Sequence, residues 1–194
     1  VGKRRLEKAI ALAGRGDVRV RWHPFQLNPH MPKEGMNRKE YRSAKFGSWE
    51  RSLELDANIV AVGKEEGIQF AFDRMERTPN TLDAHRLIWL AELEGRQDAV
   101  VEALFRGYFI EGRDISNQQV LIEVVAEAGL DRKRAEAILE SNEGMEAIKE
   151  VGELSQRHHV DGVPFFIING QFTLAGAQQP EVFLTAFNQA IGSK

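Results

Sequence analysis

The chain has 194 residues, of which 42% are hydrophobic and 28% charged, enough for one domain or for a small domain that carries a large insertion. Its net charge of −3 leaves no basic footprint for nucleic acid, and no apolar stretch is long enough to cross a membrane. The sequence contains no cysteine, so these residues form no disulfide and perform no thiol chemistry.

The first predicted elements are a helix and a strand. Residues 2–13 carry apolar side chains on one helical face, and Gly14 and Gly16 end this helix. Between residues 18 and 25, valine and tryptophan alternate with arginine, which predicts a strand with one buried face that ends at Pro24. A proline-containing loop then runs to Asn37.

Mostly helical signals fill residues 37–158. Helices are expected after caps at Asn80-Thr81, Ser116 and Asp131, from Gln97 toward Phe109, and from Gly144 to His158. The side chains predicted to be buried in this block are Leu87, Ile88, Ala91, Val124 and Val125. Because predicted strands lie on both sides of the block, we expect a helical insertion (37–158) in an α/β domain formed by residues 1–36 and 159–194.

The most informative segment is GVPFFIINGQFTLAG, residues 162–176. Asn169-Gly170 between two apolar runs predicts a hairpin with a two-residue type I′ turn, which needs φ > 0 at both positions. Pro164 stands where the first strand begins, a place where a sheet tolerates a missing N–H. A helix follows from Pro180, with an apolar stripe formed by Phe183, Ala186, Phe187, Ala190 and Ile191. This order of elements resembles the second half of a thioredoxin fold, in which the residue–proline bond is cis and faces the active site.

Four segments together resemble the DsbA-like thiol oxidoreductases, specifically the FrnE-like branch related to 2-hydroxychromene-2-carboxylate isomerase. They are VGKRRLEKA (1–9), WHPFQLNP (22–29), PNTLDAHRL (79–87) and GVPFFIINGQFTLAGAQ (162–178), in family order. The resemblance implies an α/β, thioredoxin-like fold with a large all-helical insertion. In the family, a central strand ending in a C-x-x-C motif precedes the VGKRRLE helix, so we expect that strand and motif upstream of Val1. The alternative is a natural variant that lost the strand.

The resemblance also implies the site residues. Pro164 is the catalytic-loop residue, and the Val163 N–H and C=O are expected to pair with an extended substrate backbone. Gly176, Ala177 and Gln178 lead into the last helix, whose N–H groups would receive the γ-glutamyl carboxylate of glutathione or serve only as a cap. Asn28 borders the family's cleft, and His85 is either a cleft residue or a structural histidine. Lys3, Arg4 and Arg5 are expected to face solvent. No metal site is expected, since His158 and His159 lack ligand spacing.

The function implied by the resemblance is thiol–disulfide exchange, with the redox cysteines outside these residues. The expected partner is a protein or small-molecule disulfide or thiol, with no cofactor beyond glutathione as a co-substrate, and a homodimer is the expected assembly. With no signal peptide ahead of Val1, a cytoplasmic location is expected. Two alternatives stay open: a glutathione-dependent isomerase or transferase, and a non-catalytic peptide-binding module.

Overall fold

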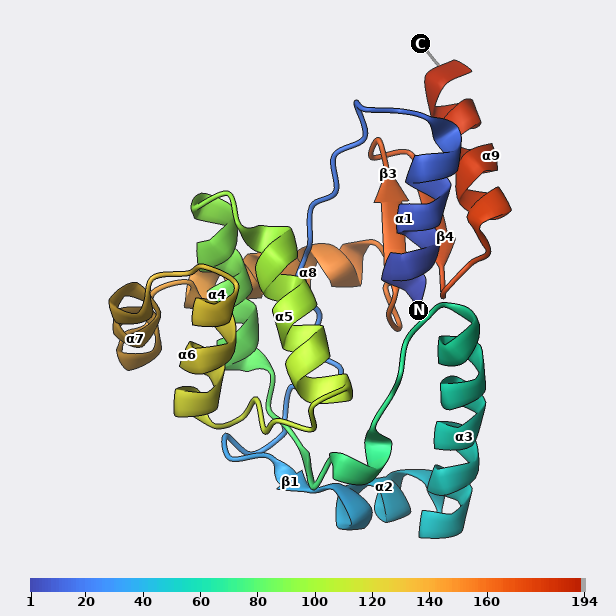
Figure 1. The fold of residues 1–194 in the computed structure, drawn as a ribbon. Coiled ribbons are helices and arrows are strands. Elements are labelled where there is room, and N and C mark those ends of the chain that lie inside the picture. Colours follow the sequence, from blue (N-terminus) through green and yellow to red (C-terminus); the bar gives the residue numbers. More distant parts are fainter. Residues whose placement is uncertain (193–194) are drawn as a thin grey trace.

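The fold is mainly helical, with two short pairs of antiparallel strands (Figure 1), as seen in a computed structural model that describes residues 1–192. The helices in this part of the chain are α1 (Gly2–Ala13), α2 (Arg38–Phe46), α3 (Trp49–Glu65), α4 (Leu82–Leu93), α5 (Gln97–Phe109), α6 (Gln118–Glu127), α7 (Arg132–Glu140), α8 (Met145–Arg157) and α9 (Pro180–Gly192), with the 3-10 turn η1 (Phe72–Arg74). Strands β1 (Met36–Asn37) and β2 (Arg77–Thr78) pair antiparallel, as do β3 (Phe165–Ile168) and β4 (Phe172–Ala175). Among the described residues, no helix is long and apolar enough to cross a membrane.

Two separate apolar clusters hold the chain together. The larger one lies among α4, α5, α6 and α7, and the smaller one lies between α1, α9 and one face of the β3–β4 hairpin. Of the side chains predicted to be buried in the helical block, Ile88 is only partly buried, and the others are buried: Leu87, Ala91, Val124 and Val125. The larger cluster lies within residues 37–158 and the smaller one outside them, which supports the predicted division into two domains. The division itself stays a prediction.

The hairpin forms where the Asn-Gly step predicts it. Asn169 and Gly170 have φ values of 51° and 69°, and the Gln171 N–H donates to the Ile168 carbonyl at 3.1 Å, as a type I′ turn requires. Because β4 begins only at Phe172, Gln171 is one more loop residue than a two-residue connection has. The helix α9 buries Phe183, Ala186, Phe187 and Ala190, but the prediction was wrong for Ile191, which is 42% exposed.

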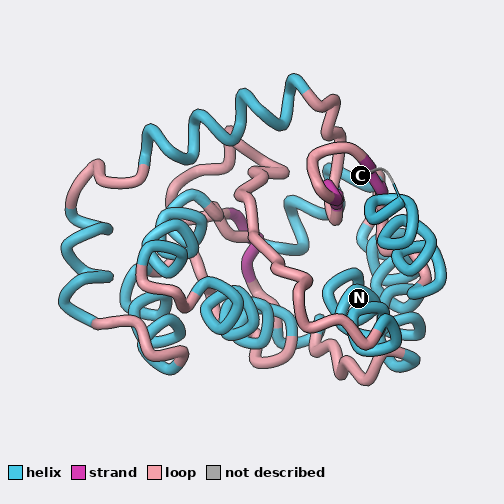
Figure 2. Tube along the Cα trace, turned by 90° about the horizontal axis from the view of Figure 1, so that it is seen from above, coloured by secondary structure: helices cyan, strands magenta, loops and turns pink. Residues whose placement is uncertain are grey.

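The predicted strand at residues 18–25 is not a strand. This segment belongs to a loop that runs from α1 to β1 (Figures 1 and 2), and no strand in residues 1–192 pairs with it. The backbone of Trp22 instead pairs with a side chain: its N–H donates to Gln97 Oε1 and its C=O accepts from Gln97 Nε2, both at 2.9 Å. Alternation of apolar and polar residues defines a face, but a strand also needs a neighbouring strand, and none of the strands in residues 1–192 pairs with this segment.

The helix starts follow the sequence closely, with one correction. The N-cap of α6 is Asn117, whose Oδ1 accepts from the N–H groups of Gln119 and Val120, and not Ser116. Ser116 Oγ instead lies 2.5 Å from the Asp114 carboxylate and 3.1 Å from the Glu34 carbonyl oxygen. Asp131 caps α7 as predicted, accepting from the Arg134 N–H.

Candidate active site at the start of α1

The first turn of α1 lies directly against the loop that precedes β3. A Cβ placed on Gly2 would approach Pro164 Cγ to 2.8 Å and Phe166 Cζ to 3.3 Å. The Val163–Pro164 peptide bond is cis, as the hairpin motif predicts, and Val163 is 51% exposed. The N-terminus of α1 therefore lies next to the accessible Val163–Pro164 peptide. The unpaired N–H groups of the first turn of α1 favour an anion there.

The residues between β4 and α9 lie against the Pro164 loop on one side of the start of α1. The Gly176 N–H donates to the Pro164 carbonyl at 2.8 Å, which extends the ladder by one pair beyond the strands. Gln178 folds back on the same turn: its N–H donates to the Gly176 carbonyl, and its Nε2 donates to the Ala175 carbonyl at 2.6 Å. The structure thus brings Pro164, Gly176 and Gln178 together.

The two edges of the hairpin differ in their partners. Since Pro164 and Gly176 form a hydrogen-bonded pair, the backbone groups of Phe166 and Ile168 also point toward β4. Those of Val163, Phe165 and Ile167 alternate with them and point to the opposite edge. Within residues 1–192, no strand pairs with that edge.

Arg5 connects the start of α1 to two other elements. Its Nε donates to Glu66 Oε1 and its Nη1 to the Ala177 carbonyl, both at 2.6 Å. The side chains of Arg5 and Glu66 are 9% and 6% exposed, so the expectation that Arg5 faces solvent was wrong. Lys8 donates to the second carboxylate oxygen, and the Lys8 and Arg5 cations lower the pKa of Glu66 below its usual value.

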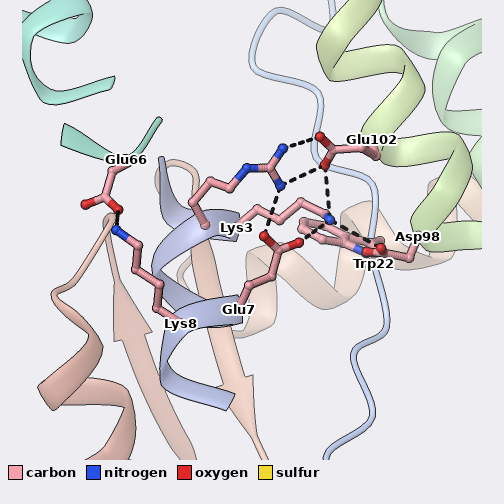
Figure 3. A network of polar contacts seen from close by, with 8 residues as sticks. Lys3, Glu7, Lys8, Trp22, Glu66, Asp98 and Glu102 are labelled. Atoms are coloured by element: carbon pink, nitrogen blue, oxygen red, sulfur yellow. Dashed lines mark hydrogen bonds and ion pairs between the residues drawn. The ribbon is translucent and has the colours of Figure 1, made fainter. Parts of the chain in front are cut away.

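The neighbouring basic residues join α1 to α5 (Figure 3). Lys3 Nζ lies 3.2 Å from Asp98 Oδ2 and 3.1 Å from Glu102 Oε2, and Arg4 also pairs with Glu102. The Lys3 side chain is 9% exposed, so it too does not face solvent, whereas Arg4 is 36% exposed. Hydrogen bonds from Arg4 and Lys3 lower the pKa of Glu102. This network fixes the direction of α1 against the helical block.

Asn28 and His85 lie elsewhere. Asn28 Oδ1 accepts from the Tyr41 hydroxyl of α2 at 2.5 Å, and His85 of α4 makes a hydrogen bond with the backbone of Phe25. Burial lowers the pKa of His85 to about 4, and its Nδ1 has no partner among the described residues. The contacts described for these two side chains do not reach the Pro164 loop. Residues 1–192 also bring together no three histidine, aspartate or glutamate side chains that could hold a metal ion.

Sequence reasoning missed Arg5 and Glu66 as residues of this site. A signal for Arg5 was present, because it shares a helical face with Gly2, Leu6 and Ala9, all of which are buried. An arginine on a buried face needs a partner. Nothing in the sequence identifies that partner as Glu66, which follows the end of α3 and is 61 residues away.

The family follows from a comparison with family models. Residues 1–188 match the DSBA-like thioredoxin domain. The chain belongs to the DsbA-like thioredoxin family. A search of curated proteins gives no match.

Two solved structures resemble the chain. A probable DsbA oxidoreductase from Streptomyces coelicolor superimposes with a TM-score of 0.92 at 31% identity, over 100% of this chain and 84% of that protein. A 2-hydroxychromene-2-carboxylate isomerase superimposes with a TM-score of 0.69 at 19% identity, over 97% of this chain and 87% of that protein. The first resemblance supports both family and fold, and the second supports the fold, a thioredoxin-like α/β fold with helical content.

Proposed function

We propose that this DsbA-like protein is a thiol–disulfide oxidoreductase of the FrnE-like type whose C-x-x-C motif lies upstream of α1. The observation that carries the proposal is the contact of Gly2 with Pro164, because a residue directly before α1 would lie beside the exposed Val163–Pro164 step. A thiol at a helix N-terminus has a lowered pKa and ionises more readily. The thiolate would attack one sulfur of a substrate disulfide, release the other as a thiolate, and be resolved by the second cysteine.

The free edge of β3 supports the same proposal. Val163, Phe165 and Ile167 point their backbone groups at this edge, and segment 18–25 is also without a strand partner in the described residues. A strand that leads into α1 from the edge of β3 would satisfy the groups of Phe165 and Ile167. The exposed Val163 backbone would then be left to pair with an extended substrate, a β-augmentation contact.

Insulin reduction by the 194-residue chain, compared with the protein that its gene encodes from its own start site, tests the proposal. The 194-residue chain should match the uncatalysed rate, since it has no thiol. The full product should reduce insulin, and replacing its motif cysteines by serine should abolish that activity. A full product with no cysteine before α1 would overturn the proposal.

The absence of cysteine from the 194 residues favours one alternative, a glutathione-dependent isomerase or transferase. In that case Gly176, Ala177 and Gln178 would receive glutathione at the start of α9. Saturable binding of glutathione by a full product that does not reduce insulin would select this alternative. Binding of peptides alone, with neither activity, would select a non-catalytic module.

A further inference from the structure

Helix α3 presents an apolar surface to solvent. Its buried residues, Ser52, Asp56 and Gly63, lie on one side, and α2 is its main neighbour among the described helices and strands. Leu53 and Val60 lie on another side and are 47% and 39% exposed. In Figure 1, α3 lies at the edge of the molecule. A second helix could therefore reach this side of α3.

The exposed side of α3 has the residue spacing of a coiled coil. Five exposed residues follow one another at steps of three and four positions, and we call them the α3 seam: Glu50, Leu53, Ala57, Val60 and Lys64. The three inner residues are apolar, and the two outer ones carry opposite charges. This pattern is typical of a helix that packs lengthwise against another helix.

A cavity of about 300 Å³ lies beside the α3 seam. Leu53, Ala57 and Val60 line it from α3, and Phe70 and Phe72 line it from the segment that follows α3. None of the residues around Pro164 lines it. Apolar side chains of a second helix would enter between the seam and these rings, and would bury apolar surface on both partners.

The charges at the two ends of the α3 seam favour a second copy of α3 as the occupant. Neither Glu50 nor Lys64 has an ion-pair partner among residues 1–192. Each lies seven residues from Ala57, which is about 10 Å along the helix. In an antiparallel pair with Ala57 at the midpoint, Glu50 lies opposite Lys64 of the second copy, and this pairing occurs twice. Leu53 then lies beside Val60 of the second copy, whereas a parallel pair would place like charges opposite each other.

We propose that α3 forms the interface of a homodimer, in which two copies of the α3 seam pack antiparallel around a two-fold axis near Ala57. Such an interface uses the same surface on both copies and closes after two of them. The antiparallel helix dipoles add to the attraction. Because the seam covers only about two heptads, we expect a dissociation constant of about 1–100 μM. The interface gives the expected homodimer a surface and an axis, and it does not depend on the proposed thiol exchange.

Single cysteines test the axis, because the 194-residue chain has none of its own. Ala57→Cys places two thiols across the proposed axis, where a disulfide needs a Cα separation of about 4.4–6.8 Å. Ala61→Cys is the matched control, since its two thiols would lie about 12 Å apart along the axis. With oxidised glutathione, Ala57→Cys should form a covalent dimer at least about tenfold faster than Ala61→Cys, measured on non-reducing gels. Equal rates would overturn the homodimer and leave the α3 seam to a helix of another protein.

A charge exchange tests the antiparallel direction. Glu50→Lys and Lys64→Glu each place like charges opposite each other, and each should weaken the dimer about tenfold in sedimentation velocity. An equimolar mixture should form a heterodimer about as tight as the wild-type dimer, because both end charges are basic in one variant and acidic in the other. A mixture that associates no better than the single variants would overturn the proposal, as would equal association of all samples, which the free edge of β3 would give. Should a charge variant not fold, the comparison of the two cysteine variants still decides the question.

Discussion

Gly2 and Pro164 touch at the point where α1 begins, and the contact leaves no room for a side chain on Gly2. A Cβ there would come within 2.8 Å of the proline ring. A ring fixed in a loop cannot turn aside as the end of a long side chain can, so either the helix or the loop would have to shift. The position of the helix start relative to Val163–Pro164 therefore depends on glycine at residue 2.

Gly2→Ala should destabilise the protein by about 1–2 kcal/mol, because overpacking costs about 1–3 kcal/mol and the better helix propensity of alanine returns at most about 1 kcal/mol. The matched control is Gly152→Ala in α8, where a Cβ meets nothing within 4 Å. That variant should be neutral or stabilised by up to about 1 kcal/mol. Urea unfolding measures both, and a Gly2→Ala protein as stable as the wild type would show that the contact relaxes freely.

Arg5→Met should cost about 3 kcal/mol of unfolding free energy, since it leaves the buried Glu66 carboxylate without one of its two cations and leaves the Ala177 carbonyl without its donor. Arg51→Met is the control, because Arg51 pairs with Glu54 at the surface and the two side chains are 59% and 64% exposed. Removing that pair should change stability by less than about 0.5 kcal/mol. Similar effects of the two variants in denaturant unfolding would contradict a structural role for Arg5.

The Arg5–Glu66 ion pair also makes the free energy of unfolding depend on pH, in a direction that follows from the lowered pKa of Glu66. The folded-state pKa of Glu66 is lowered, first by Lys8 and then by Arg5, so its contribution to stability is present above the unfolded-state carboxyl pKa. That contribution is lost as pH falls through the lowered value. The difference in stability between wild type and Arg5→Met should therefore shrink in acid.

Most local signals in this sequence predict the structure correctly, to within a residue at the Ser116 cap, whereas signals that need a distant partner do not. Asn169-Gly170 sets its own backbone conformation, so the hairpin could be predicted from two residues. The segment 18–25 has the alternation of a strand, yet strand formation depends on a neighbouring backbone that its own residues do not specify. For the same reason the sequence alone does not predict the burial of Arg5, because the carboxylate that pairs with it, Glu66, follows the end of α3.

His85 should make the protein lose stability as pH falls from about 6.5 to 4. Burial lowers its folded-state pKa to about 4, and the hydrogen bond with the Phe25 backbone only partly opposes this. Since the unfolded chain takes up the proton near pH 6.5, the folded state is fully stable above that pH and loses about 2–3 kcal/mol by pH 4.

His85→Gln isolates this contribution from that of the carboxylates, which titrate in the same range. The stability lost by the wild type between pH 7 and pH 4.5 should exceed that of the variant, whereas replacing exposed His30 by Gln should leave the loss unchanged. Equal losses in wild type and His85→Gln would show that His85 becomes protonated without cost.

Gln97→Ala should release the segment around Trp22. The Gln97 amide makes both backbone hydrogen bonds of Trp22, and the variant leaves that N–H and C=O to water. We expect faster hydrogen exchange of the Trp22 amide and a loss of about 1–2 kcal/mol in stability. Gln119→Ala, on an exposed position of α6, is the control. Unchanged exchange at Trp22 would mean that its indole contacts with Asp98 and Phe105 hold the segment by themselves.

The free edge of β3 should make the 194-residue chain associate with itself, because an edge with unpaired backbone groups recruits a partner strand. Ile167→Pro removes the N–H that points to this edge, and Thr173→Pro removes the N–H of its cross-strand partner, which points to the outer edge of β4. Neither N–H takes part in the β3–β4 ladder, so the two variants carry a similar strain and differ in the edge that they block. Sedimentation velocity over a concentration series should show species larger than the α3 dimer for the wild type and for Thr173→Pro, and none larger than that dimer for Ile167→Pro. A wild-type chain that forms nothing larger than that dimer at high concentration would show that the edge of β3 is protected in solution, and equal behaviour of the two variants would place the further association elsewhere.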